Sequence, residues 1–127
     1  AGKDAADRAR GVQLARQAVE KDDAGALNNL AWMLCTSTHD DVRKPADGMT
    51  YVARLEKMPD LTPGTVDTLA ACYAAVGQYP RAVELQQQVI ADMRKRPAPA
   101  LANIKEMEAR LALYRAGKPY IEVPAKR

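Results

Sequence analysis

Short helical segments, separated by turn residues at similar intervals, constrain this chain more than any other feature. Within each segment apolar residues recur three and four positions apart, which is the spacing of one face of an α-helix. No stretch shows the strict alternation of apolar and polar residues that marks a half-buried strand. The pattern predicts helices at about residues 4–21, 26–36, 45–58, 62–76, 80–96 and 100–115.

Length and composition narrow the architectures that six such helices can form. The 127 residues suffice for one domain with a core of its own. Hydrophobic residues make up 47% of the chain but none is Phe, so Ala, Leu and Val must supply the core. Small, helix-favouring residues suit helices that approach closely. A helical bundle and a helical solenoid are therefore the two architectures to consider.

Individual residues predict where several helices begin and end. Pro45 falls in the first turn of a helix, where its missing N–H costs nothing. Thr62 is a candidate N-cap followed by Pro63 at the first helical position. Gly77 predicts a left-handed C-cap. The polar segment 22–25 is expected to break the first helix, and residues 37–41 to form a loop.

An internal repeat favours the solenoid. The pair Leu30-Ala31 can be placed over Leu69-Ala70, with each pair in the middle of a predicted helix. Small residues also recur in alternate helices, where they would let one helix of a pair press its backbone against the other. The small residues that recur after 37 and 34 positions are Gly11, Gly48 and Ala82. We therefore expect antiparallel helix pairs stacked in series.

The repeat resembles the tetratricopeptide repeat (TPR). The matching residues are Val66, Leu69, Ala70, Tyr73, Gly77, Tyr79 and Ala82. Ala70 departs from the more common Gly, and Gln86 stands where the family prefers an aromatic residue. An earlier, more divergent copy carries Leu27, Leu30, Ala31 and Leu34, with a turn expanded by about five residues around 37–43. Residues 27–32 and 114–120 also look like the closing repeats of bacterial multi-repeat TPR proteins, so the resemblance covers roughly residues 8–120.

This resemblance implies an all-α fold, a right-handed α–α superhelix of about two and a half repeats with a C-terminal capping helix. The repeat domain would span residues 1–119, followed by a basic tail at 120–127. The chain then begins on the second helix of a repeat, whose apolar face has no partner. We expect either that the native protein extends further at its N-terminus or that the domain pairs there with itself or with another chain.

The resemblance also implies a function, the binding of a protein or peptide in a concave groove lined by the first helix of each pair. Carried over position by position, the groove residues are Asn28, Trp32, Cys35, Asp67, Ala71 and Ala74. Trp32 is the only Trp of the chain and a candidate anchor, although it could instead pack against the first helix. Asp67 would repel a terminal carboxylate, so we expect no affinity for the C-terminal tails that chaperone-binding members hold.

No residue pattern indicates catalysis, a metal or a cofactor. His39, Asp40 and Asp41 are the only cluster with suitable side chains, but one His among sequence neighbours is typical of a solvated turn. Gln86, Gln87 and Gln88 are likewise interpreted as solvated helix surface. Motifs for phosphate cradles, nucleophile elbows and zinc proteases are missing. We therefore expect a protein that is not an enzyme.

Charge and cysteine content bear on partners and compartment. From Arg94 onward there are nine Lys and Arg against three Asp and Glu, yet residues 94–96 close a helix, where cations complement the dipole, so nucleic acid is an unlikely partner. No apolar run reaches the roughly eighteen residues that a membrane span needs. Cys35 and Cys72 are interpreted as small buried residues, and a disulfide stays open, as does the choice between bacterial cytoplasm and periplasm.

Two other functions stay open at this point. The chain could be an immunity or inhibitor protein that neutralises an enzyme or toxin. It could also be a structural domain that caps or oligomerises a larger bacterial protein.

Overall fold

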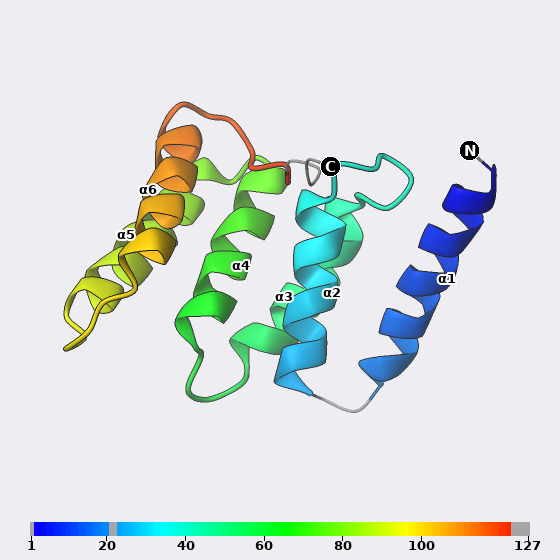
Figure 1. Ribbon diagram of the computed structural model, residues 1–127, viewed down its shortest axis with the longest axis horizontal. Coiled ribbons are helices and arrows are strands. Elements are labelled where there is room, and N and C mark those ends of the chain that lie inside the picture. The colour runs from blue at the N-terminus through cyan, green and yellow to red at the C-terminus, as the bar shows by residue number, and fades with distance from the viewer. Residues whose placement is uncertain (1, 21–22, 123–127) are drawn as a thin grey trace. The chain divides into compact units, whose positions relative to one another are not determined.

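A computed structural model describes residues 2–20 and 23–122 of the chain (Figure 1). These residues form six helices and no strand, as expected for an all-α helical repeat fold. The helices are α1 (Gly2–Ala18), α2 (Ala24–Thr36), α3 (Pro45–Glu56), α4 (Pro63–Ala75), α5 (Tyr79–Arg94) and α6 (Leu101–Arg115). In the described part of the chain, no helix has the length and apolar character to cross a membrane.

The helices are distributed over two compact units. Of the described residues, the first unit comprises 2–20, 23–59 and 121–122, and the second comprises 60–120. In the first unit α2 packs against α1 and α3, and in the second α5 packs against α4 and α6. Each unit therefore contains three of the described helices, and the second of the three contacts both of the others.

The predicted helix starts at Pro45 and Thr62 are confirmed. The hydroxyl of Thr62 accepts a hydrogen bond from the Thr65 backbone N–H at 3.2 Å, and Pro63 is the first residue of α4. The expected break at 22–25 is too long at its C-terminal end, because α2 begins at Ala24 and not at the predicted residue 26. Asp23 caps α2, because its carboxylate accepts hydrogen bonds from the Gly25 and Ala26 N–H groups at 2.9 and 3.2 Å. The first helix ends at Ala18, and Lys21, its predicted end, lies outside the described residues.

Gly77 and Gly117 end α4 and α6 in the same way. Their φ angles are +84° and +70°, in the left-handed region that glycine tolerates best. After α4, the N–H of Gly77 donates to the carbonyl of Ala74, and that of Gln78 to the carbonyl of Tyr73. After α6, the equivalent bonds run from Gly117 to Tyr114 and from Lys118 to Leu113. Both ends are Schellman motifs, and the predicted left-handed cap at Gly77 is confirmed.

The predicted close contact of a small residue with a neighbouring helix is confirmed at Gly48 and wrong at Gly11. A Cβ atom at Gly48 would lie only 2.5 Å from Cys35 Sγ and 3.5 Å from Leu34 Cβ, so α3 does press its backbone against α2. Ala82 of α5 is fully buried. At Gly11 the expectation is wrong, because nothing lies within 4 Å of the position a Cβ would take.

Apolar residues of α5 and α6 form the clearest core cluster of the second unit. Its buried members are Val89, Ile90, Met93, Ile104, Met107 and Leu111. The three-and-four spacing of the sequence also favours these six positions as the inward side of the two helices. Leu101 shares that spacing and was expected to point inward, but it is 72% exposed. In α1 the same spacing is a poorer guide, since Ala9 and Ala18 are exposed, and the buried Val19 lies just after the end of the helix.

Alanine substitutions of Gly48 and Gly11 test whether the backbone approaches a neighbouring helix closely in α3 but not in α1. We expect Gly48→Ala to lower the free energy of unfolding by about 1–3 kcal/mol, because the added methyl group overpacks the contact with Cys35. Gly11→Ala is the matched control, and it should raise that free energy by roughly 0.5–1 kcal/mol through helix propensity alone. Urea unfolding followed by circular dichroism at low protein concentration measures both. Equal effects at the two sites would contradict the close approach at Gly48.

Candidate functional site

A buried ion pair connects α4 and α6. Asp67 lies in the second turn of α4 and is only 7% exposed. Arg110 of α6 donates from Nε to Asp67 Oδ1 at 3.1 Å and from Nη2 to Oδ2 at 2.7 Å. This two-pronged geometry is the strongest form of the Arg–carboxylate contact, and burial shields it from water. The negative charge of Asp67 is therefore neutralised inside the second unit.

Gln86 of α5 completes the polar group. Its Nε2 atom donates to Asp67 Oδ1 at 3.0 Å and to the backbone carbonyl of Met107 at 3.0 Å. The side chain is fully buried, so the interpretation of Gln86 as solvated surface is wrong, whereas Gln87 and Gln88 are exposed. The carboxylate and the carbonyl accept both hydrogens of the amide, whereas its Oε1 atom accepts no hydrogen bond within the described residues. One residue from each of α4, α5 and α6 thus joins a single network.

Two tyrosines lie beside the pair. The Tyr120 ring centroid is 5.1 Å from Arg110 Cζ, within the range of a cation–π contact. Burial by itself would lower the pKa of Arg110, but the charge and hydrogen bonds of Asp67 raise it above its ordinary value. Burial raises the pKa of the Tyr114 phenol, and the nearby negative charge of Asp67 adds to this. The Tyr114 hydroxyl makes no hydrogen bond in the described part of the protein.

This network changes the reasoning about Asp67. The resemblance to the tetratricopeptide repeat implied that its carboxylate lies in a groove, where it would repel a partner's terminal carboxylate. Because the carboxylate is buried and bound to Arg110 and Gln86, it presents no free negative charge, and that argument for repulsion fails. The network instead fixes how α6 lies against α4 and α5.

The six predicted groove residues differ in what they expose. Asn28, Trp32 and Cys35 lie on α2 in the first unit, and Asp67, Ala71 and Ala74 lie on α4 in the second. Asn28 and Trp32 are half-buried and keep accessible surface. The other four are buried, and neither Cys35 nor Cys72 is a free thiol. Asn28 and Trp32 are thus the members of the set that a partner could reach.

The cluster His39, Asp40 and Asp41 forms a loop tied down by ion pairs. Arg8 of α1 binds both carboxylate oxygens of Asp41 at 3.0–3.1 Å. Arg43 pairs with Asp40 at 2.5 Å, and the backbone N–H of His39 donates to Ser37 Oγ. Within residues 2–20 and 23–122, no three His, Cys, Asp or Glu side chains are grouped so that they could hold a metal ion.

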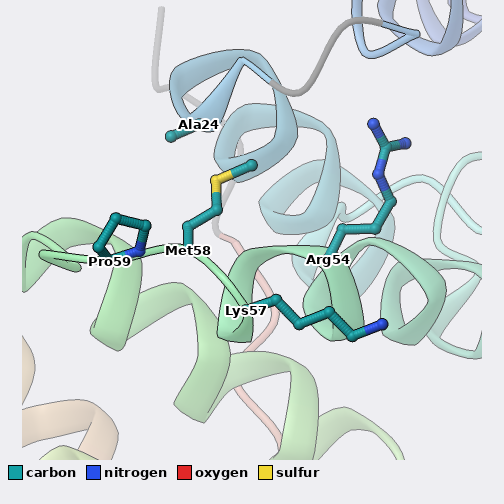
Figure 2. A pocket seen from close by; sticks show the side chains of 5 residues that line it. All are labelled: Ala24, Arg54, Lys57, Met58 and Pro59. Carbon is teal, nitrogen blue, oxygen red and sulfur yellow. The ribbon is translucent and has the colours of Figure 1, made fainter.

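A cavity of the first unit lies where α3 ends near the start of α2. It has a volume of about 670 Å³ and is lined by Ala24, Arg54, Lys57, Met58 and Pro59 (Figure 2). The Met58 side chain extends toward Ala24, whereas the Arg54 and Lys57 side chains extend in different directions. Arg54 also donates to the carbonyl of Val19 at 2.6 Å. The two cations therefore do not converge on a common ligand position.

Comparison with protein-family models, with curated proteins and with solved structures found no match in any of the three.

The buried ion pair predicts a large effect of removing one partner and a small effect of removing both. Arg110→Met leaves the Asp67 carboxylate buried without its cation, and we expect it to lower the free energy of unfolding by about 3–5 kcal/mol. The double variant Asp67→Leu with Arg110→Met should recover most of this loss, because no uncompensated charge remains. Urea unfolding of the single and double variants measures the difference. An Arg110→Met protein as stable as the parent would contradict the structural role of the pair.

The contact between Arg8 and Asp41 predicts a pH dependence at the start of α1. Hydrogen bonds from Arg8, together with its charge, hold the pKa of Asp41 below its ordinary value of 3.8. A lowered pKa means that the contact is complete above that ordinary value and is lost as the pH falls through the pKa of the folded protein. A carboxyl-carbon NMR titration should show the lowered pKa in the parent protein and an ordinary one in Arg8→Gln. The same pKa in both proteins would show that the contact does not form in solution.

Proposed function

We propose that this chain is a non-catalytic protein-binding module of the tetratricopeptide type, and that its contact surface is the exposed side of α2 around Trp32. The observation that carries the proposal is that Trp32, the only Trp of the chain, keeps accessible surface on α2, whereas Leu27, Leu30 and Leu34 of the same helix are fully buried. A partly exposed Trp on a helix can give a large, rigid contact area at low entropic cost, and Trp is enriched among residues that dominate binding energy.

Asn28 supports this choice of surface. It precedes Trp32 by one helical turn and so lies on the same side of α2. Its amide oxygen accepts no hydrogen bond within the described part of the chain, although the atom itself is shielded from water. Because the atom is shielded, an N–H group of a partner, such as one from the backbone of a bound peptide, would reach it after the Asn28 side chain turns outward. The proposed partner is therefore a peptide segment with an apolar side chain for Trp32 and a backbone N–H for Asn28.

The sequence resemblance contributes to the same proposal, because the first helix of each pair lines the binding groove in TPR proteins. The earlier set of groove residues is reduced to Asn28 and Trp32, since Ala71 and Ala74 have no surface to offer. No reaction is proposed for this site.

The test combines capture of a partner with a direct binding measurement. Immobilised chain is exposed to a lysate of the source organism, and proteins retained by the parent but not by Trp32→Ala are identified and purified. Because Trp32 is the only Trp, a partner that lacks Trp can then be titrated by following the fluorescence of this residue. We expect a change in its emission, and an affinity lowered about tenfold or more in Asn28→Ala and Trp32→Ala.

Leu101→Ala is the matched control, since it removes another accessible apolar side chain, 72% exposed, from α6. It should leave the affinity unchanged. Urea unfolding must show that the Trp32→Ala protein is folded under the binding conditions. A partner that binds folded Trp32→Ala as tightly as the parent would rule out this surface.

A further inference from the structure

The row of residues that carries the proposed partner surface continues to the last residue of α2. Asn28, Trp32 and Thr36 are spaced four positions apart, so they follow one side of the helix. Asn28 and Trp32 keep accessible surface, whereas Thr36 is fully buried. The Thr36 hydroxyl donates to the carbonyl of Trp32 at 2.8 Å, which joins these two residues directly. The C-terminal end of the row is therefore covered, although its other two members are accessible.

Backbone N–H groups from other segments bind the carbonyl groups at this end of α2. The last carbonyls of a helix have no partner within the helix itself. Lys44, in the loop that follows α2, donates to the carbonyl of Leu34 at 2.8 Å. Glu122, which is far later in the sequence and outside any helix, donates to the carbonyl of Thr36 at 2.7 Å. The end of α2 thus accepts the backbone of a remote, non-helical segment.

Ile121 and Glu122 carry the two features that we propose for a partner peptide. Ile121 has an apolar side chain that is 41% exposed, and Glu122 supplies the backbone N–H that reaches α2. Both residues belong to the first unit, as α2 does. Both are also exposed and non-helical, and segments of that kind open at a low cost in free energy. The contact at Thr36 is therefore one that a competing peptide can displace.

We propose that residues 121–122 regulate the partner surface of α2 by occupying its C-terminal end, so that a bound peptide displaces them. A backbone N–H of the peptide takes the place of the Glu122 N–H at Thr36, and the rest of the peptide extends over Trp32 toward Asn28. The attached segment competes with the peptide at an effective concentration on the order of millimolar. This inference rests on the proposed function, because it concerns the same surface.

Two substitutions of Glu122 separate its backbone from its side chain. Glu122→Pro removes the N–H and with it the hydrogen bond to Thr36, whereas Glu122→Ala removes the carboxylate and keeps the bond. The probe is a synthetic peptide of residues 118–123, acetylated and amidated, which is added to the full 127-residue chain. NMR follows the Ser37 amide, which shares a peptide group with the Thr36 carbonyl, and the single indole N–H, that of Trp32.

The peptide should bind the Glu122→Pro protein more tightly than the other two. We expect it to shift the Ser37 and Trp32 signals of that protein at concentrations about tenfold lower than in the parent or in Glu122→Ala, where the attached segment competes. The same peptide with Glu122→Pro is the control probe, and it should shift neither signal in any of the three proteins. In the parent, the Glu122 amide should exchange its hydrogen with solvent more slowly than in the free peptide.

Three results would overturn the inference. Equal peptide affinity in Glu122→Pro and Glu122→Ala would show that the hydrogen bond does not control access to α2. A shift of the Ser37 signal without a shift of the Trp32 signal would show that the contact lies outside the partner surface. If circular dichroism shows that Glu122→Pro is unfolded, hydrogen exchange in the parent decides, because a Glu122 amide that exchanges as fast as in the free peptide does not occupy α2.

Failure of the proposed function gives a different result from failure of this inference. A captured partner that binds Trp32→Ala as tightly as the parent rejects the partner surface, whatever the peptide titration shows. A partner that binds Trp32→Ala more weakly, but binds Glu122→Pro and the parent equally, supports the surface and overturns its regulation by residues 121–122. Tighter binding of that partner to Glu122→Pro than to Glu122→Ala supports both.

Discussion

The charge of Asp67 is the constraint on which the second unit depends. A carboxylate that is removed from water needs a cation and hydrogen-bond donors, and here they come from Arg110 and Gln86. Apolar contacts between α5 and α6 tolerate small sliding movements, whereas the Gln86 amide must reach both Asp67 and the Met107 carbonyl. The polar network therefore selects one register of three helices. It adds specificity more than net stability, because desolvation offsets much of the attraction in such a pair.

The helix ends follow from chemistry that acts over a few residues, and for that reason most of them could be predicted. Thr62 with Pro63 at the start of α4 and Gly77 at its end each satisfy or remove local backbone groups. Asp23 shows the limit of this reasoning. An Asp shortly before a Gly favours a turn as well as a helix start. In the structure the Asp23 carboxylate accepts hydrogen bonds from two backbone N–H groups, and it therefore caps a helix start.

The polar network could not be predicted, because its members are far apart in the sequence and periodicity treats polar residues as solvated. Gln86 and Asp67 are 19 positions apart, and Arg110 is 43 positions from Asp67. For each of the two donors, Gln86 and Arg110, the sequence contains one indication that the side chain is buried. Gln86 lies four residues after Ala82 and three before Val89, and Arg110 lies between the inward residues Met107 and Leu111. A polar residue within an apolar stripe is the pattern that a buried network produces. The failed expectation at Gly11 has a different origin, since a repeat register identifies the inward side of a helix but not whether a neighbour covers it.

The buried phenol of Tyr114 makes the stability of the second unit depend on pH in alkaline solution. Its pKa is raised above the ordinary value of 10.0, whereas an unfolded chain would ionise it near that value. The unfolded state therefore releases this proton first as the pH rises, so the stability that Tyr114 contributes is complete below about pH 10 and declines above it. Alkaline solution therefore destabilises the second unit through Tyr114, whereas acid weakens the contact between Arg8 and Asp41 at the start of α1.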